Sequence, residues 1–119
     1  MIAAFLASAA LALSSAPAED WRAVEGVGDA GAQFWIDMDS IRLEGAITHF
    51  RIRFSMPNVE GLLYVDSAAD CAGKTVEIRH VRRIKDGQTV ASEDIPPGTQ
   101  PQSLEDEQGL ILQKLICKS

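Results

Sequence analysis

The sequence predicts an α+β protein: an antiparallel β-sheet of about five to six strands with one C-terminal amphipathic helix packed on one face, held by one disulfide. Three observations lead to this prediction. Apolar and polar residues alternate with a period of two in the middle of the chain, as they do in strands with one buried face. Apolar residues recur at helical spacing near the C-terminus. Two cysteines, Cys71 and Cys117, stand in the part that we expect to fold.

The first eighteen residues, MIAAFLASAALALSSAPA, contain no charged side chain. Their apolar run from Ile2 to Leu13 is shorter than the roughly 20 residues that a membrane-spanning helix needs. Small residues follow and end in Ala16-Pro17-Ala18, which has the A-x-A form of a signal-peptide cleavage site. We therefore expect residues 1–18 to be a secretory signal peptide and residues 19–119 to be the exported domain, with no transmembrane segment in its mature form. The alternative is a buried N-terminal helix.

Strand patterns follow the expected cleavage site. The pattern is clearest over residues 47–56, where apolar Phe50 and Ile52 alternate with polar His49 and Arg51. Aromatic and β-branched residues, which favour strands, mark other segments, and a glycine-rich segment over residues 26–31 predicts a loop. The predicted strands are residues 21–25, 33–38, 47–56, 61–66, 74–85 and 88–92.

The end of the chain changes from strands to a helix. Asp86-Gly87 predicts a two-residue hairpin, because a type I′ turn needs positive φ at both residues. Residues 95–101 contain three prolines and predict an extended connection. Ser103 is the expected N-cap, with acidic residues in the first turn, where the helix dipole favours negative charge. Gly109 weakens the helical pattern slightly. The acidic residues are Glu105, Asp106 and Glu107, and the apolar stripe is Leu104, Ile111, Leu112, Leu115 and Ile116.

Cys71 and Cys117 are the two cysteines of the chain, and both follow the expected export signal. In an oxidising compartment such a pair is expected to form a disulfide. Closing a loop of about 47 residues would stabilise the fold by about 4 kcal/mol in the chain-entropy model. The bond would tie the end of the helix to the sheet. A reactive thiol or a metal site is the alternative.

Charge and motifs exclude several classes of function. The net charge is −6, whereas nucleic-acid binding needs a surplus of Lys and Arg, so we expect no nucleic-acid partner. Residues 26–31 spell G-x-G-x-x-G, but a strand pattern follows where a dinucleotide site needs a helix. Asp37-Met38-Asp39 begins like a calcium loop, but Ile41 and Arg42 stand where an oxygen ligand and a glycine are required.

No residue pattern indicates catalysis. His49 and His80 are the two histidines, with His49 on the polar face of its predicted strand and His80 on the buried phase. A zinc site or a catalytic triad needs such residues to converge with acids, thiols or a nucleophile. No serine stands in a G-x-S-x-G elbow, and both cysteines are assigned to the disulfide. We therefore expect no enzyme activity, no cofactor and no metal.

Basic residues cluster on two of the predicted strands. If these strands are neighbours, their polar faces merge into one cationic stripe on an otherwise acidic domain. Such a stripe would be a docking surface for an acidic protein or a polyanion. The alternative is a solvated sheet face whose charges maintain solubility. The residues of this predicted basic patch are Arg51 and Arg53 on the first strand and Arg79, Arg83 and Lys85 on the second.

Several short motifs stand in an order that resembles a known family. Trp21-Arg22-Ala23-Val24 opens the expected domain, and FWIDMDSIRLEG follows from Phe34 to Gly45. Asp70-Cys71, the Lys85–Gly87 hairpin and a final helix with the second cysteine complete the order. Together they resemble the surface-adhesin protein E-like family of small exported bacterial envelope proteins, over nearly all of the expected domain. The resemblance implies an antiparallel sheet with a disulfide-linked C-terminal helix, located at the cell surface or in the periplasm.

The resemblance also implies a function. The founding member of the family is an adhesin that binds host matrix and plasma proteins. We therefore expect an exported protein-binding or adhesin-like domain of the cell envelope, without catalysis. The alternative is a periplasmic accessory protein, such as an inhibitor or a structural envelope component. The resemblance carries over Cys71 and Cys117 as a structural pair and no ligand-contact residue.

Overall fold

The structure, a computed structural model, describes residues 19–25, 31–99 and 101–117. The predicted signal peptide, residues 1–18, lies outside these residues. So do residues 26–30, which include most of the predicted glycine-rich loop and of its G-x-G-x-x-G pattern.

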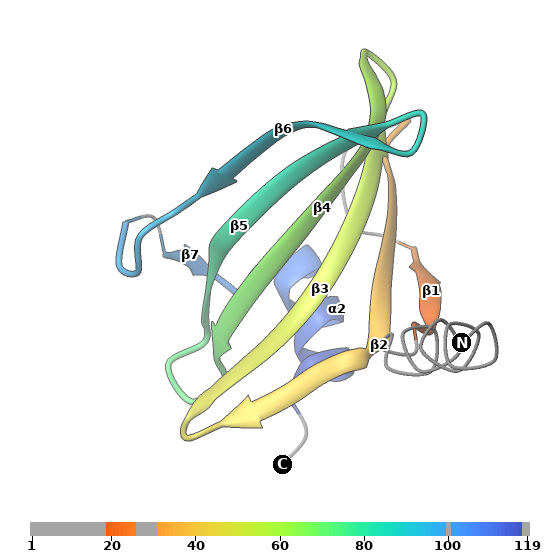
Figure 1. Ribbon diagram of the computed structural model, residues 1–119. Helices are drawn as coiled ribbons and strands as arrows, with labels where there is room; N and C mark the ends of the chain where they lie inside the picture. The colour runs from red at the N-terminus through yellow and green to blue at the C-terminus, as the bar shows by residue number, and fades with distance from the viewer. Residues whose placement is uncertain (1–18, 26–30, 100, 118–119) are drawn as a thin grey trace, which may run out of the picture.

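In the described residues, one antiparallel sheet of seven strands forms the body of the molecule (Figure 1). Six strands lie side by side in the same order as along the chain, and the short last strand pairs with the fifth. The strands are β1 (Trp21–Val24), β2 (Gln33–Glu44), β3 (Ile47–Met56), β4 (Val59–Asp70), β5 (Thr75–Lys85), β6 (Gln88–Asp94) and β7 (Gln102–Ser103), and the helix that follows is α2 (Glu107–Ile116).

The predicted fold class is confirmed: an antiparallel sheet, one C-terminal helix and one disulfide. The bounds of β3 are as predicted, because its alternation is regular from end to end. β2 and β4 are longer than predicted, since polar residues near their ends still pair with neighbouring strands. The strand β7 was not predicted. It is two residues long, and it pairs with the start of β5.

The hairpin between β5 and β6 turns at the predicted dipeptide. Asp86 has φ of 51° and Gly87 has φ of 77°, the positive values that a type I′ turn requires. The sign of φ explains why a β-branched residue would be strained at either place. The turn makes β5 and β6 antiparallel neighbours, with Lys85 opposite Gln88.

The start of the helix differs from the prediction. Asp106, not Ser103, is the N-cap, and its Oδ1 accepts a hydrogen bond from Gly109 N at 2.7 Å. Ser103 belongs to β7, where its Oγ accepts from Glu105 N at 3.0 Å. Of the three predicted first-turn acids, Glu107 alone is in the helix. Leu104 precedes the helix, and its buried side chain is part of the core.

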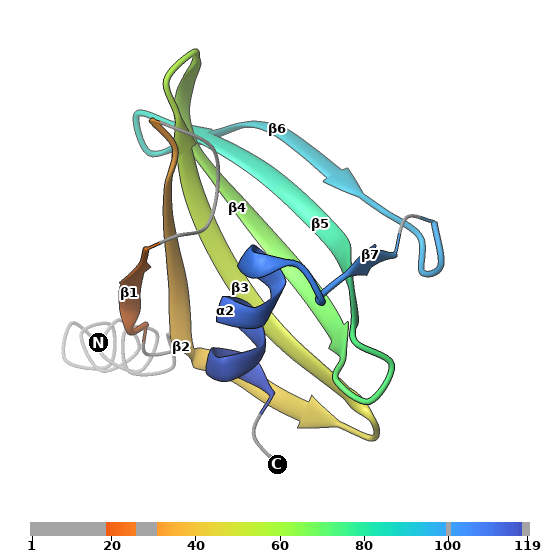
Figure 2. The same cartoon turned by 180° about the vertical axis from the view of Figure 1, so that it is seen from behind.

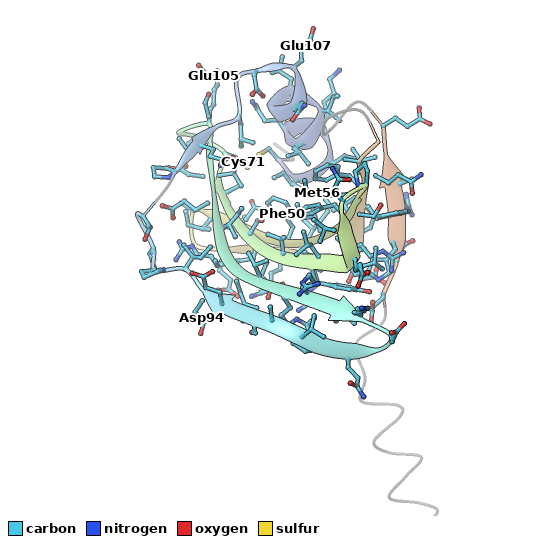
Figure 3. The ribbon with its side chains drawn as sticks, turned by 90° about the horizontal axis from the view of Figure 1, so that it is seen from above. Phe50, Met56, Cys71, Asp94, Glu105 and Glu107 are labelled. Carbon is cyan, nitrogen blue, oxygen red and sulfur yellow. A yellow bond between two sulfur atoms is a disulfide. The ribbon has the colours of Figure 1, made fainter. Side chains whose placement is uncertain are left out.

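The core lies between the sheet and α2. The buried residues that form it come from three strands, from the segment before the helix and from the helix end. Figure 3 shows Phe50 between the curved sheet and α2, with Cys71 beside the helix. The core residues are Ile36, Phe50, Ala69, Leu104 and Ile116.

The disulfide fastens the helix to the sheet. Cys71 directly follows β4, and Cys117 directly follows α2, where its backbone N–H donates to Gln113 O. The two Cα atoms lie 5.7 Å apart, within the usual range for a disulfide. Because 46 positions separate the cysteines, the bond closes a loop that contains β5, β6, β7 and α2.

The two faces of the sheet have different surroundings. In Figure 1 the strands lie in front of α2, and in the reverse view of Figure 2 the helix lies in front of the strands. No helix among the described residues covers the other face, which we call the open face. The side chains of the open face do not pack against α2, so they are available for a functional site.

Candidate functional site

The pairing of residues between neighbouring strands determines which side chains lie on the open face. Cross-strand partners in a sheet point to the same side, and neighbours along a strand point to opposite sides. Ile36 pairs with Ile52, and Ile52 pairs with Val65, so these three lie on the face that packs against α2. The residues just beside them therefore lie on the open face, among them Trp35, Arg53, Tyr64 and Arg82.

These four residues form a row of successive cross-strand partners on β2, β3, β4 and β5. The guanidinium carbon of Arg53 lies 5.1 Å from the ring centroid of Trp35 and 4.6 Å from that of Trp21 on β1. The guanidinium carbon of Arg82 lies 5.5 Å from the ring of Tyr64. Trp21 also meets Tyr64 edge to face, with ring centroids 5.7 Å apart. We call Trp21, Trp35, Arg53, Tyr64 and Arg82 the aromatic–arginine row.

The two arginines of the row have aromatic rings as neighbours in place of carboxylates. Neither Arg53 nor Arg82 is in an ion pair with a described residue. The Nε of Arg53 is buried and has no hydrogen-bond partner in the described part of the chain. Cation–π contact with two tryptophans fixes the position of Arg53 without neutralising its charge. The row therefore presents positive charge together with aromatic surface.

A second row of cross-strand partners runs beside the first and alternates between acidic and basic residues. Arg51 Nε donates to Asp66 Oδ1 at 2.8 Å, and this hydrogen bond is the main reason that the pKa of Arg51 is raised. His80 Nδ1 lies 2.5 Å from Asp94 Oδ1. Asp37, the partner of Arg51 on β2, is buried. Arg51 and His80, the two basic side chains of this charged row, thus each lie beside an acid. Its members are Asp37, Arg51, Asp66, His80 and Asp94.

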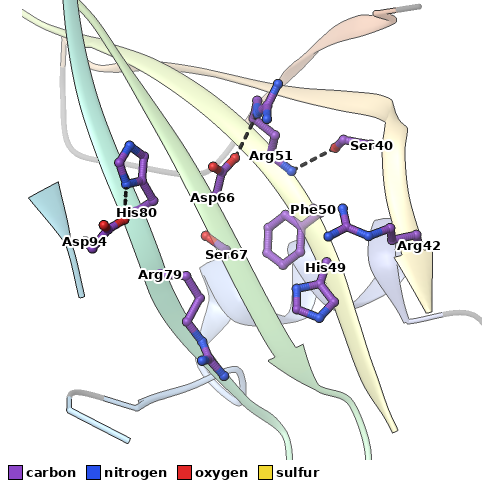
Figure 4. Close-up of a pocket in the computed structure, with 10 residues that line it drawn as sticks. All are labelled: Ser40, Arg42, His49, Phe50, Arg51, Asp66, Ser67, Arg79, His80 and Asp94. Atoms are coloured by element: carbon purple, nitrogen blue, oxygen red, sulfur yellow. Dashed lines mark hydrogen bonds and ion pairs between the residues drawn. The ribbon is translucent and has the colours of Figure 1, made fainter. Parts of the chain in front are cut away.

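A depression of about 330 Å³ opens beside the charged row (Figure 4). Two β-bulges help to form it. β2 has extra residues between Asp37 and Arg42 opposite β3, and β5 has Arg79 as an extra residue opposite β4. Ser40 in the first bulge accepts a hydrogen bond from Arg51 N at 2.8 Å. The depression is lined by Ser40, Arg42, His49, Phe50, Arg51, Asp66, Ser67, Arg79, His80 and Asp94.

Ser92, His80 and Asp94 have the connectivity of a hydrolase triad. His80 contacts Asp94 through Nδ1 at 2.5 Å and Ser92 Oγ through Nε2 at 3.1 Å. In a working triad the acid is buried and fixes the imidazole, and an oxyanion hole stands beside the nucleophile. Here the side chain of Asp94 is 91% exposed, and Ser92 lies on the exposed strand β6. Water competes for these contacts, so Ser92 lacks the fixed position that a nucleophile needs. The expectation that the chain is not an enzyme stays a prediction.

The predicted basic patch is not a single surface. Arg51 and Arg53 lie on the open face, and β4 separates their strand from β5. Arg83 pairs with Leu63, on the face that carries α2, and contacts Glu60 O. Lys85, two residues further on, lies beside Glu60 and forms an ion pair with its carboxylate.

The physical reason for this correction is the bulge at Arg79. One extra residue in β5 reverses the alternation of its side chains between the two faces of the sheet. Residues before Arg79 therefore lie on the predicted face, and residues after it lie on the opposite face. Arg79 itself lines the depression and lies 3.3 Å from Glu77. The same reversal brings His80 to the open face. The sequence pattern alone predicts His80 on the buried face of the strand. It also brings Arg82 there, in place of Arg83.

His49, and Asp37 of the Asp37-Met38-Asp39 segment, each contact neighbouring residues that account for their positions. His49 Nε2 lies 3.6 Å from Glu44 Oε2. A side-chain hydrogen bond from Arg42 lowers the pKa of Glu44. Asp37 Oδ1 accepts from Asp20 N at 2.9 Å and from Asp39 N at 3.0 Å. Among the described residues, no three acidic, histidine or cysteine side chains converge as a metal site would require.

Sequence reasoning missed the aromatic members of the row. Trp35 and Ile36 are neighbours on a strand, so one of them had to point away from the core. The alternation over residues 33–38 therefore held a signal for a tryptophan on the face away from the core. Its meeting with Arg53 and Tyr64 depends on the order and register of three strands, which the local pattern does not contain.

Comparison of the chain with family models, with curated proteins and with solved structures finds no match. The resemblance to the surface-adhesin protein E-like family therefore stays a prediction. Within the part of the chain that the structure describes, no helix is both long and apolar enough to cross a bilayer.

Proposed function

We propose that the chain is an exported protein-binding domain of the bacterial cell envelope that contacts its partner through the open face, without catalysis. The single observation that carries the proposal is the aromatic–arginine row. Trp, Tyr and Arg are the residues most enriched at the energetic centres of protein interfaces. Here three aromatic side chains and two arginines from five strands meet on a face that no described helix covers.

The row is already organised in the free protein. Stacking on Trp21 and Trp35 restricts Arg53, and contact with Tyr64 restricts Arg82. A partner then loses less side-chain entropy on binding than it would with freely rotating arginines. All five side chains arise from strands of one sheet, which gives the surface a rigid support.

Export is supported by the signal-peptide pattern of residues 1–18 and by the disulfide, which forms in oxidising compartments. The resemblance to the adhesin family favours a surface location. A periplasmic accessory protein would use the same face for a different partner. Protease treatment of intact cells separates the two locations, because a surface domain is degraded before osmotic shock and a periplasmic domain only after it.

Site-specific photo-crosslinking in cells tests the proposal. Ala23 is exposed and pairs with Trp35, so p-benzoylphenylalanine at position 23 would border the row. The matched control is the same residue at position 110, because Leu110 is 50% exposed on α2. We expect position 23 to give a discrete protein adduct that Trp35→Ala weakens at least tenfold, and position 110 to lack it. Equal adducts from both positions, or none from position 23, would count against the open face.

A further inference from the structure

Two arginines on the open face form no ion pair with a described residue, although the protein as a whole is acidic. The net charge is −6, and Arg22, Arg42, Arg51 and Arg79 all lie within 4 Å of a carboxylate. Arg53 and Arg82 form no ion pair with any described residue, although each is on a central strand.

The surroundings of this arginine pair select an anionic ligand. Rings on the open face hold Arg53 and Arg82, and the buried Nε of Arg53 lacks an acceptor in the described residues. A planar guanidinium held in this way can offer its remaining N–H groups to a carboxylate as a two-pronged donor. Tyr64 lies between the two arginines in the row and offers an aromatic surface for apolar contact.

The pair also limits the charge density of the ligand. Asp66 follows Tyr64 by two residues on β4, so the charged row lies about 7 Å from the aromatic–arginine row. A uniformly charged polyanion lying across the sheet would meet Asp66 and the exposed Asp94. A protein segment with separated carboxylates can reach the arginines and avoid those acids.

The spacing of the pair indicates the conformation of such a segment. The backbones of Arg53 and Arg82 lie on β3 and β5, two strand spacings or about 10 Å apart along the row. In a polyproline II helix, residues three apart share a side and are separated by about 9 Å. In a β-strand, residues on one side are separated by about 7 or 13 Å. Aromatic surfaces are also the usual receptors for proline-rich segments.

We propose that Arg53 and Arg82 bind two carboxylates, three residues apart, on an acidic proline-rich segment of a partner protein. The proposal rests on the protein-binding function proposed above and names the partner's chemistry. It assigns the arginine pair to ligand binding and the tryptophans and Tyr64 to holding that pair and covering the segment.

Fluorescence anisotropy with labelled peptides tests this proposal on the purified protein. The probe is (Glu-Pro-Pro)4, compared with neutral (Gln-Pro-Pro)4 and with a peptide of the same composition whose glutamates are consecutive. We expect the regularly spaced acidic peptide to bind best, with an affinity that falls as salt is raised. Arg53→Gln and Arg82→Gln should each weaken its binding at least tenfold.

Arg83→Gln is the matched control, because it removes the same charge from the neighbouring position on the opposite face. It should leave binding within twofold, and Arg53→Lys should retain part of the binding because the charge remains. Circular dichroism melts show that each variant is folded. Equal loss in Arg83→Gln, equal binding of the acidic and neutral peptides, or no binding of (Glu-Pro-Pro)4 overturns the proposal.

Heparin oligosaccharides supply the other outcome. Binding of heparin that depends on Arg53 and Arg82, with no binding of the peptides, would assign the pair to a glycan and overturn the peptide proposal. The photo-crosslinking result is independent of these measurements. A protein adduct at position 23 without peptide binding would leave the proposed function standing and remove only the acidic segment.

Discussion

Asp37 shows how one buried side chain positions part of the site. Its Oδ1 accepts from the backbone N–H groups of Asp20 and Asp39, and its side chain is almost completely buried. The first of these bonds holds the chain just before β1 against β2. Trp21 is the next residue, so Asp37 helps to bring that ring over Arg53.

Asp37→Ala tests this role. The substitution leaves two partly buried N–H groups without their acceptor, so we expect the free energy of unfolding to fall by about 1–3 kcal/mol. Asp37→Asn is the control, because its amide oxygen can still accept both hydrogen bonds. Urea unfolding measured by tryptophan fluorescence compares the three proteins. Identical midpoints for Asp37→Ala and the wild type would show that β1 is held by its strand pairing alone.

Residue identities predicted some of the site and not the rest. The cysteine pair could be assigned because the chain contains two cysteines and a signal-peptide pattern. Arg51 and Arg53 could be placed on one face because β3 alternates without a bulge until after Phe54. Arg82 could not be placed on a face in this way, because the face that it occupies depends on the extra residue at Arg79. A bulge is defined only by comparison with the partner strand.

At the scale of elements, α2 begins later than the sequence indicated. Ser103 and Asp106 are both good N-cap residues, and three positions separate them. Pairing of β7 with β5 uses the backbone at Ser103, so the helix starts after Asp106. The local pattern gave the existence of the helix and its apolar side. It could not decide between two caps whose choice depends on a strand elsewhere in the chain.

Gly109 has a packing role that helix propensity does not reveal. Propensity alone predicts that Gly109→Ala stabilises α2 by about 1 kcal/mol. In the structure Gly109 is buried, and an added Cβ would overlap the backbone of Leu104. We therefore expect the opposite sign, a loss of about 1–3 kcal/mol as the helix is pushed from its place.

Thermal and urea unfolding of Gly109→Ala measure the sign directly. Leu110→Ala is the control, because the Leu110 side chain is half exposed on the same helix and should change stability much less. Higher stability of Gly109→Ala than of the wild type would mean that α2 can move away from Leu104 at no cost.

The whole molecule depends on one covalent link between its sheet and its helix. The core cluster contains five buried residues among those that the structure describes, which is small, and a domain of about 100 residues buries only a modest fraction of its surface. We expect Cys71→Ser and Cys117→Ser each to lower the free energy of unfolding by about 2–5 kcal/mol. The double variant should match the single ones, because either substitution removes the same bond. Additive losses would show that the cysteines act separately.

The overall topology was open to prediction because it follows the chain. Strands joined by short turns usually lie side by side, and here the order in the sheet is the order in the sequence. No local pattern predicts which residues of distant strands meet. An example is the contact of Trp21 with Tyr64 across β2 and β3. The candidate site is therefore a property of the assembled sheet, whereas the fold class is visible in the separate segments.

The bond between Cys71 and Cys117 also determines how the molecule breaks. Residues 96–99, between β6 and β7, are exposed and irregular enough for a protease to cut. One cut there produces two polypeptides, each carrying one of the bonded cysteines. The nicked molecule keeps its full mass on a gel without reductant and separates into two bands with it. Intact and nicked protein are thus told apart in cell-surface digests only when the samples are run with reductant.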